Sequence, residues 1–350
     1  MVAALRMGGH DVCVASRFRS YERRGDGFRQ ARLASVGDRL SARFVRRCQR
    51  APQTAPQLWF TYHLYHKAPD WLGPPIAEVL RIPYVLAEAS DAPKQALGGW
   101  ALGRQAARRA ISQADAVIGL NPADRECVTP LLRDPWRWVP LRPFLDVAAY
   151  GGKTRARAGP ARLIAVGMMR YGDKLASYRL LGDALSLLRD LPWSMEVIGD
   201  GPARHEVENA LHSVRERVTW VGEIDSLEIA GRFAAADLCV WPALNEAYGM
   251  ALLEAQASGV PVVAGSGAGV GEIVVSGVTG LLVPLGDAPA FAEAVRSLIT
   301  DHSRRSAFAE AARRRVAAEH DLSTAARRLN AAIEMVSPLR QELIGSRPGL

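Results

Sequence analysis

The stretch NEAYGMALLEAQASGVPVV, residues 245–263, decides the fold. Its pattern predicts a loop, a short helix over about 249–258, and a buried strand. Gly259 ends the predicted helix, and Pro261 opens the apolar run that follows it. A short helix followed at once by an apolar strand is typical of an α/β domain built on a parallel sheet.

Two glutamates in this stretch carry the predicted chemistry. Between residues 250 and 257 the only polar side chains are Glu254 and Gln256. A carboxylate on so apolar a helix costs free energy unless it is hydrogen-bonded, and the two hydroxyls of a sugar diol match its two oxygens. Glu246 lies just before the helix, where free N–H groups and the positive end of the dipole attract phosphate. The stretch therefore predicts a site for a phosphorylated sugar.

The segment resembles the donor-binding signature of retaining glycosyltransferases of the two-lobed GT-B fold, family 4 (glycosyl transferases group 1). The resemblance implies that Glu246 contacts the donor sugar and that Glu254 holds the nucleotide ribose. It also implies that a run of backbone amides cradles the diphosphate: Ala247, Tyr248, Gly249 and Met250. Tyr248 replaces a commoner Phe. The alternative is a helix with one surface glutamate and one tolerated core glutamate.

Composition excludes several classes of protein. The chain has 350 residues, of which 49% are hydrophobic and 23% charged, as in ordinary globular proteins. No run of eighteen apolar residues occurs, and the four cysteines lack metal-ligand spacing. HExxH, P-loop, GxSxG and zinc patterns are also missing. We expect a cytoplasmic protein with no metal and no cofactor, using a nucleotide-diphosphate sugar as co-substrate.

Strand-like and helix-like segments alternate along the chain. The resemblance implies two doubly wound, Rossmann-like domains facing a cleft, the GT-B architecture. We expect an acceptor-side domain at 1–152, a donor domain at 153–322, a helix at 323–337 and a tail at 338–350, with a linker near 150–153. The expected strands are 11–15, 57–62, 83–87, 116–120 and 136–140 in the first domain, and 162–167, 194–199, 218–221, 238–241, 260–264 and 281–283 in the second.

The beginning of the chain departs from the family pattern. Residues 1–7 read as the end of a helix that Gly8 and Gly9 terminate. The family normally begins with a strand and a glycine-rich loop before that helix. We expect either a start upstream of Met1 or a truncated, inactive gene product.

Two basic residues follow the first predicted strand of the second domain. The resemblance implies an Arg and a Lys aimed at the donor diphosphate, and we assign these roles to Arg170 and Lys174. An anionic diphosphate requires such partners. Met168 stands where the family Arg usually follows the glycine. The alternative is a surface loop with ordinary charges.

Two glycines are further candidates for the donor site. Gly222 ends a strand where the family reads the nucleotide base with backbone groups, which leaves UDP-sugar and GDP-sugar donors both open. Gly269 belongs to a glycine-rich turn over 265–272 that lacks the spacing of a dinucleotide fingerprint. The family places a similar loop at the donor pocket, whereas the plain interpretation is a flexible turn.

The candidate acceptor residues follow two predicted strands of the first domain. They are His63, His66 and Glu88. Histidine in an aromatic-rich segment is more often packed than catalytic, so ordinary packing is the alternative.

The first part of the chain is basic. Residues 1–155 hold 24 Lys+Arg and 13 Asp+Glu, a net charge of +11, and the remainder carries −3. Residues 28–50 form a candidate amphipathic helix with an arginine face and an apolar stripe that begins at Phe28. Such a helix binds an anionic membrane surface on the inner face, or packs on its sheet with the arginines in solvent.

These observations together predict a glycosyltransferase that moves a sugar to a saccharide or a lipid-linked saccharide with retention. The alternatives are a non-catalytic or truncated nucleotide-sugar-binding protein and a nucleotide-sugar epimerase. A nucleic-acid-binding protein is disfavoured because the clustered arginines lack a reader motif or stacking aromatics.

Overall fold

The structure is a computed structural model that describes residues 1–151 and 159–337. Two compact units divide the described residues: Pro143–Thr324 forms one, and Met1–Arg142 groups with residues 325–337. The expected boundary at 152/153 and the expected tail at 338–350 lie outside the described residues.

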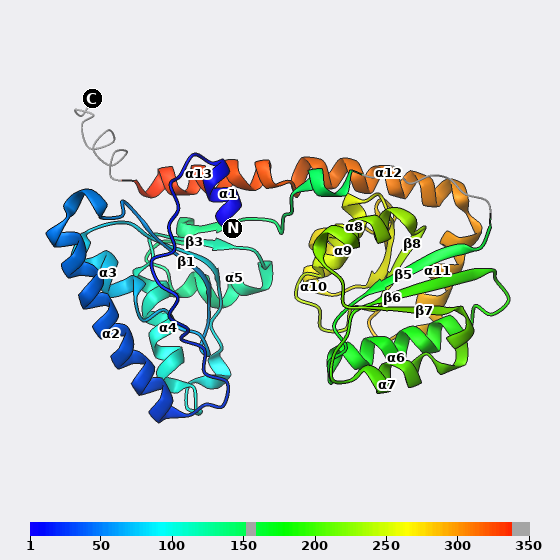
Figure 1. The fold of residues 1–350 in the computed structure, drawn as a ribbon, viewed down its shortest axis with the longest axis horizontal. Helices are drawn as coiled ribbons and strands as arrows, with labels where there is room; N and C mark the ends of the chain where they lie inside the picture. The colour runs from blue at the N-terminus through cyan, green and yellow to red at the C-terminus, as the bar shows by residue number, and fades with distance from the viewer. Residues whose placement is uncertain (152–158, 338–350) are drawn as a thin grey trace. The chain divides into compact units, whose positions relative to one another are not determined.

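The second unit is built on a six-stranded parallel sheet in the order β10-β9-β8-β5-β6-β7 (Figure 1). Its strands are short and apolar, and β8 and β9 are buried along their whole length. The strands are β5 (Ala161–Val166), β6 (Trp193–Ile198), β7 (Val218–Gly222), β8 (Leu238–Trp241), β9 (Val262–Gly265) and β10 (Gly280–Val283). This order confirms the doubly wound topology, with its switch point between β5 and β8.

Helices cover both faces of this sheet. One face carries α6 (Asp173–Ser186), with α7 (Arg204–Ala210) and α11 (Ala288–Thr300) packed against it. The other carries α8 (Ser226–Ala235), α9 (Met250–Ala257), α10 (Ala268–Ile273) and α12 (His302–Glu319). The 3-10 helices are Val147–Tyr150 and His212–Arg217. Burying both faces of the sheet produces one continuous apolar core in this unit.

The first unit contains a four-stranded parallel sheet in the order β1-β2-β3-β4. Its strands are β1 (Trp59–Leu64), β2 (Tyr84–Ala89), β3 (Ala116–Gly119) and β4 (Trp138–Pro140). Three helices pack on one another beside it: α2 (Gly27–Arg50), α3 (Gly73–Leu80) and α4 (Ala101–Gln113). The other helices are α1 (Val2–Met7), α5 (Pro122–Val128), α13 (Leu322–Val336) and 3-10 turns at Pro52–Thr54, Pro93–Gln95, Thr129–Leu131 and Pro135–Arg137.

The expected strand at 11–15 is wrong. This segment joins neither sheet, and Val14 is 74% exposed. Its alternating pattern is that of a strand, but a strand is stable only when its backbone groups are paired, and no neighbouring strand accepts them. β1 is therefore an edge of the first sheet. Two Rossmann-like α/β domains are confirmed, as the GT-B fold requires.

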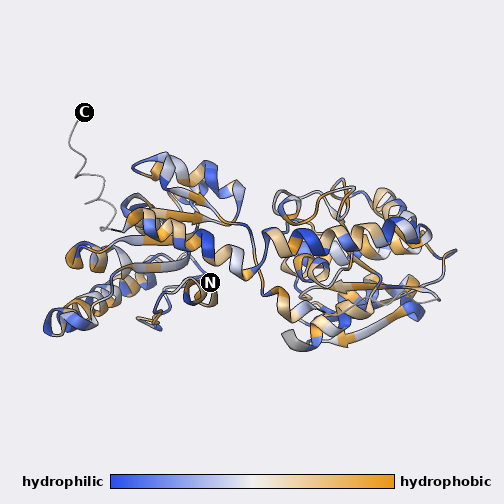
Figure 2. Cartoon of the chain, turned by 90° about the horizontal axis from the view of Figure 1, so that it is seen from above, coloured by the Kyte–Doolittle hydropathy of each residue, from blue (hydrophilic) through white to orange (hydrophobic). Residues whose placement is uncertain are grey.

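Hydrophilic and hydrophobic residues are mixed along the helices (Figure 2). Within the described residues, none of the helices combines the length and the apolar character that crossing a membrane requires.

Candidate functional site

The candidate site lies at the switch point of the second sheet. The chain leaves β5 and β8 in opposite directions along the sheet, and the loops at their carboxyl ends flank a crevice. A cavity of about 280 Å³ opens there. Val166 and Gly167 line it from the end of β5, and Trp241 lines it from the end of β8. The neighbouring loops contribute Gly199 and Glu223. Its position is that of a ligand site in an open α/β sheet.

A lysine and a glutamate from the two sides of the switch point meet in this cavity. Nζ of Lys174, on α6, donates to Oε2 of Glu246, in the loop after β8. Trp241 Nε1 lies 3.3 Å from the same oxygen, and the Lys174 ammonium lies 5.3 Å from the Trp241 ring centre. The side chains of Lys174 and Glu246 are 25% and 17% exposed, so bulk water screens the pair only partly. The structure thus brings together two of the three predicted catalytic residues.

The loop that carries Glu246 is fixed to α6. Ser177 Oγ accepts from the Leu244 amide at 3.1 Å, and Asn245 Nδ2 donates to Asp173 Oδ2 at 2.8 Å. Asn245 itself has a φ of 51°, in the left-handed region that costs a non-glycine residue free energy. The hydrogen bonds to α6 offset this cost and hold the loop in the conformation that presents Glu246.

The amino end of α9 faces the same cavity. Gly249 precedes the helix with φ 73°, and Met250 and Ala251 line the cavity. The amides of Leu252 and Leu253 both donate to the Gly249 carbonyl. In the described part of the chain, the Met250 and Ala251 amides have no hydrogen-bond partner, as expected for the first turn of a helix. These donors and the helix dipole make this end of α9 suited to bind an anion.

Gly269, on α10, allows the predicted cradle to form. A Cβ at this position would lie 1.5 Å from the Ala247 carbonyl oxygen and 3.2 Å from the Tyr248 nitrogen. Only glycine permits the start of α10 to approach the loop before α9 this closely. Gly269 therefore shapes the 247–248 backbone, whatever else it contacts.

Glu254 lies one turn further along α9, half-buried. Burial raises its pKa, and the hydroxyl of Tyr150 acts in the opposite direction. Burial and the nearby Glu254 carboxylate in turn raise the pKa of Tyr150 to about 12. Glu254 does not line the cavity that contains Glu246. The sequence reasoning missed Tyr150, which it assigned to a linker, because no local pattern connects two residues so far apart in the chain.

The residues that line this cavity belong to a segment of the chain that matches a known protein family. Residues 160–301 match the family model of glycosyl transferases, group 1. Among curated proteins, the chain is 28% identical over 221 residues to a glycogen synthase of Mycobacterium tuberculosis, covering 62% of the chain and 53% of that relative. It is 32% identical over 260 residues to a D-inositol 3-phosphate glycosyltransferase of Kineococcus radiotolerans, covering 64% and 57%. The chain thus spans little more than half the length of these relatives.

A solved structure shows the same fold. The structure of HepE from Anabaena in complex with UDP superposes with a TM-score of 0.70 and 19% identity, covering 86% of this chain and 84% of that one. The similarity extends over both Rossmann-like domains, so the GT-B fold is established for the chain, and the group 1 match lies within its second unit.

Two other predicted donor residues, Arg170 and Gly222, do not line this cavity. Arg170 is exposed and does not line the cavity, whereas Met168 does. Gly222 has φ 84°, and its carbonyl accepts from the Gly199 amide at 2.8 Å, while the next residue, Glu223, reaches the cavity. Met168, Glu223 and Trp241 are lining residues that the sequence reasoning did not select. The donor roles of Arg170 and Gly222 stay predictions.

In the first unit, His63 and Glu88 come together at the carboxyl ends of β1 and β2. His63 Nδ1 lies 3.4 Å from Glu88 Oε2. The Glu88 hydrogen bond raises the pKa of His63; burial acts to raise the pKa of Glu88, but His63 and Tyr62 outweigh it and lower that pKa. Both residues have positive φ, 64° and 58°. Strained backbone at paired polar residues is typical of functional sites.

His66 is placed differently. Its ring packs edge-on against Trp100, with centroids 5.7 Å apart. Burial and then Lys67 lower its pKa, which favours the neutral ring. His66 is therefore a packed side chain, the alternative to an acceptor contact, whereas His63 pairs with a carboxylate. In the described residues no cluster of three His, Cys, Asp or Glu could hold a metal ion.

Proposed function

We propose that the protein is a family 4 glycosyltransferase that transfers a sugar from a nucleotide-diphosphate sugar, with retention, to a saccharide or lipid-linked saccharide. The observation that carries the proposal is the Lys174–Glu246 pair beside the free amides of α9 at the switch point. The group 1 match and the relatives named as glycosyltransferases support it. HepE, whose structure contains UDP, supports a UDP-sugar as the donor, and a GDP-sugar is the second candidate.

The donor would be held by groups of complementary chemistry. The Glu254 carboxylate accepts from the ribose diol, and the amides of residues 247–250 bind the diphosphate. Glu246 contacts the transferring sugar. When the bond between the anomeric carbon and the phosphate oxygen breaks, negative charge grows on the leaving diphosphate. Lys174, with Arg170, stabilises that charge.

The acceptor would lose a proton as it attacks. We assign the same-face mechanism that is usual for the family the chain resembles, in which the leaving phosphate takes the acceptor proton. His63 and Glu88, with His66, are the proposed acceptor contacts. We place the protein in the cytoplasm, peripheral on the inner membrane face through Phe28 to Arg50, with no metal, cofactor or nucleic acid required.

The test begins with calorimetric titration of UDP and GDP into the full chain, the Glu254→Ala variant and the control Glu293→Ala. Glu293 is an exposed carboxylate on α11 of the same unit, so it controls for loss of one negative charge. Binding of one nucleotide, lost only in Glu254→Ala, is expected. Binding of neither nucleotide to the folded chain would overturn the proposal.

The second step separates transfer from binding. The preferred nucleotide sugar is incubated with saccharide and lipid-linked acceptors, and the anomeric proton coupling of the product is read by NMR. Acceptor-dependent release of nucleoside diphosphate with an α-linked product from an α-linked donor is expected. Nucleotide binding with donor consumption that no acceptor changes would favour the epimerase alternative, and binding without turnover the non-catalytic one.

A further inference from the structure

Trp241, the last residue of β8, lines the cavity at the switch point, yet it is only 2% exposed. Its Nε1 donates to Oε2 of Glu246, the same oxygen that accepts from Nζ of Lys174. Among the described residues, these two groups are the donors to the Glu246 carboxylate. The indole and the ammonium together therefore set where this carboxylate points.

The indole of Trp241 is tightly enclosed. The Tyr178 ring packs edge-on against it with centroids 4.9 Å apart, and the buried Tyr178 hydroxyl donates to the Gly167 carbonyl at 2.8 Å. A Cβ at Gly167 would lie 3.0 Å from the indole, so the backbone after β5 also lies against the ring. A ring packed this closely keeps one orientation, and its N–H therefore keeps one direction.

Lys174 is a different kind of donor. Its ammonium stands on a flexible stem, its side chain is 25% exposed, and it lies 5.3 Å from the Trp241 ring centre, whose negative face attracts it. In the proposed function this ammonium also stabilises the leaving diphosphate, which carries more negative charge than one carboxylate. As the ammonium turns toward the diphosphate, the indole N–H is the donor that stays on Glu246.

We propose that Trp241 is the positioning residue for Glu246: its fixed indole N–H keeps the carboxylate aimed at the transferring sugar while Lys174 binds the diphosphate. An indole nitrogen is a neutral donor that accepts nothing, so it holds a carboxylate without taking up the diphosphate itself. The inference rests on the proposed function, because that function assigns Glu246 to the sugar and Lys174 to the diphosphate. It adds a residue that acts through Glu246 and touches neither reacting atom.

The test replaces Trp241 by phenylalanine. Trp241→Phe keeps an aromatic ring beside Tyr178 but removes the N–H that reaches Glu246. It also leaves a small cavity, because phenylalanine is the smaller side chain. The controls must therefore lose both an indole hydrogen bond and the same volume.

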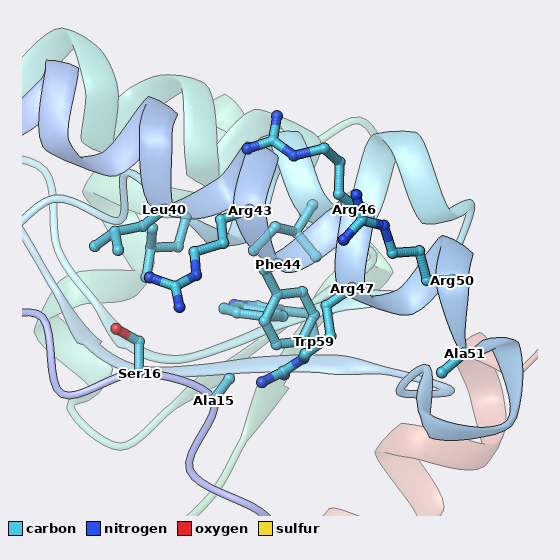
Figure 3. Close-up of a pocket in the computed structure, with 12 residues that line it drawn as sticks. Ala15, Ser16, Leu40, Arg43, Phe44, Arg46, Arg47, Arg50, Ala51 and Trp59 are labelled. Carbon is cyan, nitrogen blue, oxygen red and sulfur yellow. The ribbon is translucent and has the colours of Figure 1, made fainter.

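Two other buried tryptophans meet this requirement. Trp193, at the start of β6 in the same unit, donates from Nε1 to the Leu188 carbonyl at 2.7 Å and does not line the cavity. Trp59, at the start of β1 in the first unit, donates from Nε1 to Thr61 Oγ1 at 3.1 Å. Figure 3 shows Phe44 against the Trp59 ring, an edge-on pair like that of Trp241. Trp193→Phe and Trp59→Phe thus reproduce the structural loss away from Glu246.

Steady-state kinetics with the accepted nucleotide sugar provide the first readout. For Trp241→Phe, kcat and kcat/KM should fall together by about 10- to 100-fold, because the lost hydrogen bond orients Glu246 in the transition state. KM and the calorimetric Kd of UDP or GDP should stay within about twofold, and both controls should keep kcat within about twofold. Equal losses of kcat in all three variants would show a packing role and overturn the proposal.

A second substitution tests whether Trp241 acts through Glu246. Glu246→Asp withdraws the carboxylate by one methylene and takes it out of reach of the indole N–H. Adding Trp241→Phe to Glu246→Asp should then change kcat by less than about twofold, because the interaction is already lost. The full loss of kcat in this background would mean that Trp241 acts on another group, and it would overturn the proposal.

Fluorescence separates failure of this inference from failure of the proposed function. An ammonium that leaves the ring face changes the emission of the indole, so saturating UDP or GDP should change tryptophan emission in the wild type and both controls and not in Trp241→Phe. Nucleotide binding with the same emission change in all four proteins would overturn the inference and leave the donor site in place. Binding of neither nucleotide, or binding without transfer by the wild type, would overturn the proposed function and this inference with it.

Discussion

Replacing Glu254 by glutamine separates stability from binding. Because burial raises the pKa of Glu254, the ionised carboxylate destabilises the folded chain when no ligand is bound. Glutamine keeps the shape and removes the charge. The folded pKa lies above the unfolded one, so the protonated form is the one that folding favours. At a pH above both pKa values, the folded wild type therefore carries a free-energy penalty that Glu254→Gln lacks.

The expected stabilisation is about 0.5–2 kcal/mol, the usual gain when a residue kept for function is replaced by one that suits the fold. In a unit of this size, 1 kcal/mol corresponds to a shift in Tm of about 2–4 °C. The gain should shrink as the pH falls through the raised pKa, because the wild-type side chain then becomes neutral too. Scanning calorimetry at pH 7.5 and pH 5, with Glu293→Gln as the exposed control, measures both values.

The same substitution should weaken nucleotide binding. One carboxylate oxygen is replaced by an amide donor, so at least one charge-assisted hydrogen bond from the ribose is lost, at a cost of about 1.5–3 kcal/mol. That loss is roughly a 10- to 150-fold increase in the Kd of UDP or GDP. A lower Tm at pH 7.5 together with unchanged nucleotide affinity would refute the reasoning, because Glu254 would then stabilise the fold and not bind the ligand.

Three further substitutions test the site. Lys174→Met should lower kcat by about 10²–10³, with little change in Tm, if the ammonium stabilises the leaving diphosphate; steady-state kinetics decide, and an unchanged kcat would remove Lys174 from the mechanism. Gly269→Ala should lower the free energy of unfolding by about 1–3 kcal/mol and weaken nucleotide binding, because its Cβ would overlap the Ala247 carbonyl oxygen; denaturant unfolding with unchanged stability would contradict this. Tyr150→Phe should raise the pKa of Glu254 further, because the hydroxyl that lowers this pKa is removed. As the pH is lowered, Glu254 then becomes protonated at a higher pH than in the wild type, and nucleotide affinity should fall at that higher pH. Superimposable profiles of nucleotide affinity against pH would contradict this.

The sequence predicted the second unit well because its signals are local. Strands buried on both faces are short apolar runs, and β6, β8 and β9 lie where those runs are. The helix expected over about 249–258 is α9, Met250–Ala257. Gly249 precedes it and Gly259 follows it, both with positive φ, and such a glycine after the last turn is a common end of a helix. Where residue type alone sets the backbone conformation, the sequence is sufficient.

The first unit was predicted less well because its structure depends on pairing between distant segments. Residues 11–15 have a strand pattern but no strand beside them. Phe28 was expected on the apolar stripe of its helix, yet it is 92% exposed. Periodicity shows that a helix has an apolar side, but which residues of that side find a partner depends on where the helix ends relative to the sheet.

The candidate site shows the same division between local and distant signals. Glu246 and Glu254 are visible in the sequence because a charge on an apolar stretch is unusual. Trp241 and Tyr150 were missed because an aromatic residue at the end of a strand or in a connecting segment has no such contrast with its neighbours. Both act through the carboxylates that the sequence does show: Trp241 Nε1 lies 3.3 Å from Glu246 Oε2, and Tyr150 lowers the pKa of Glu254. The side chains that hold a charged group in place are thus harder to predict than the charged group itself, since their contribution depends on three-dimensional proximity and not on residue type.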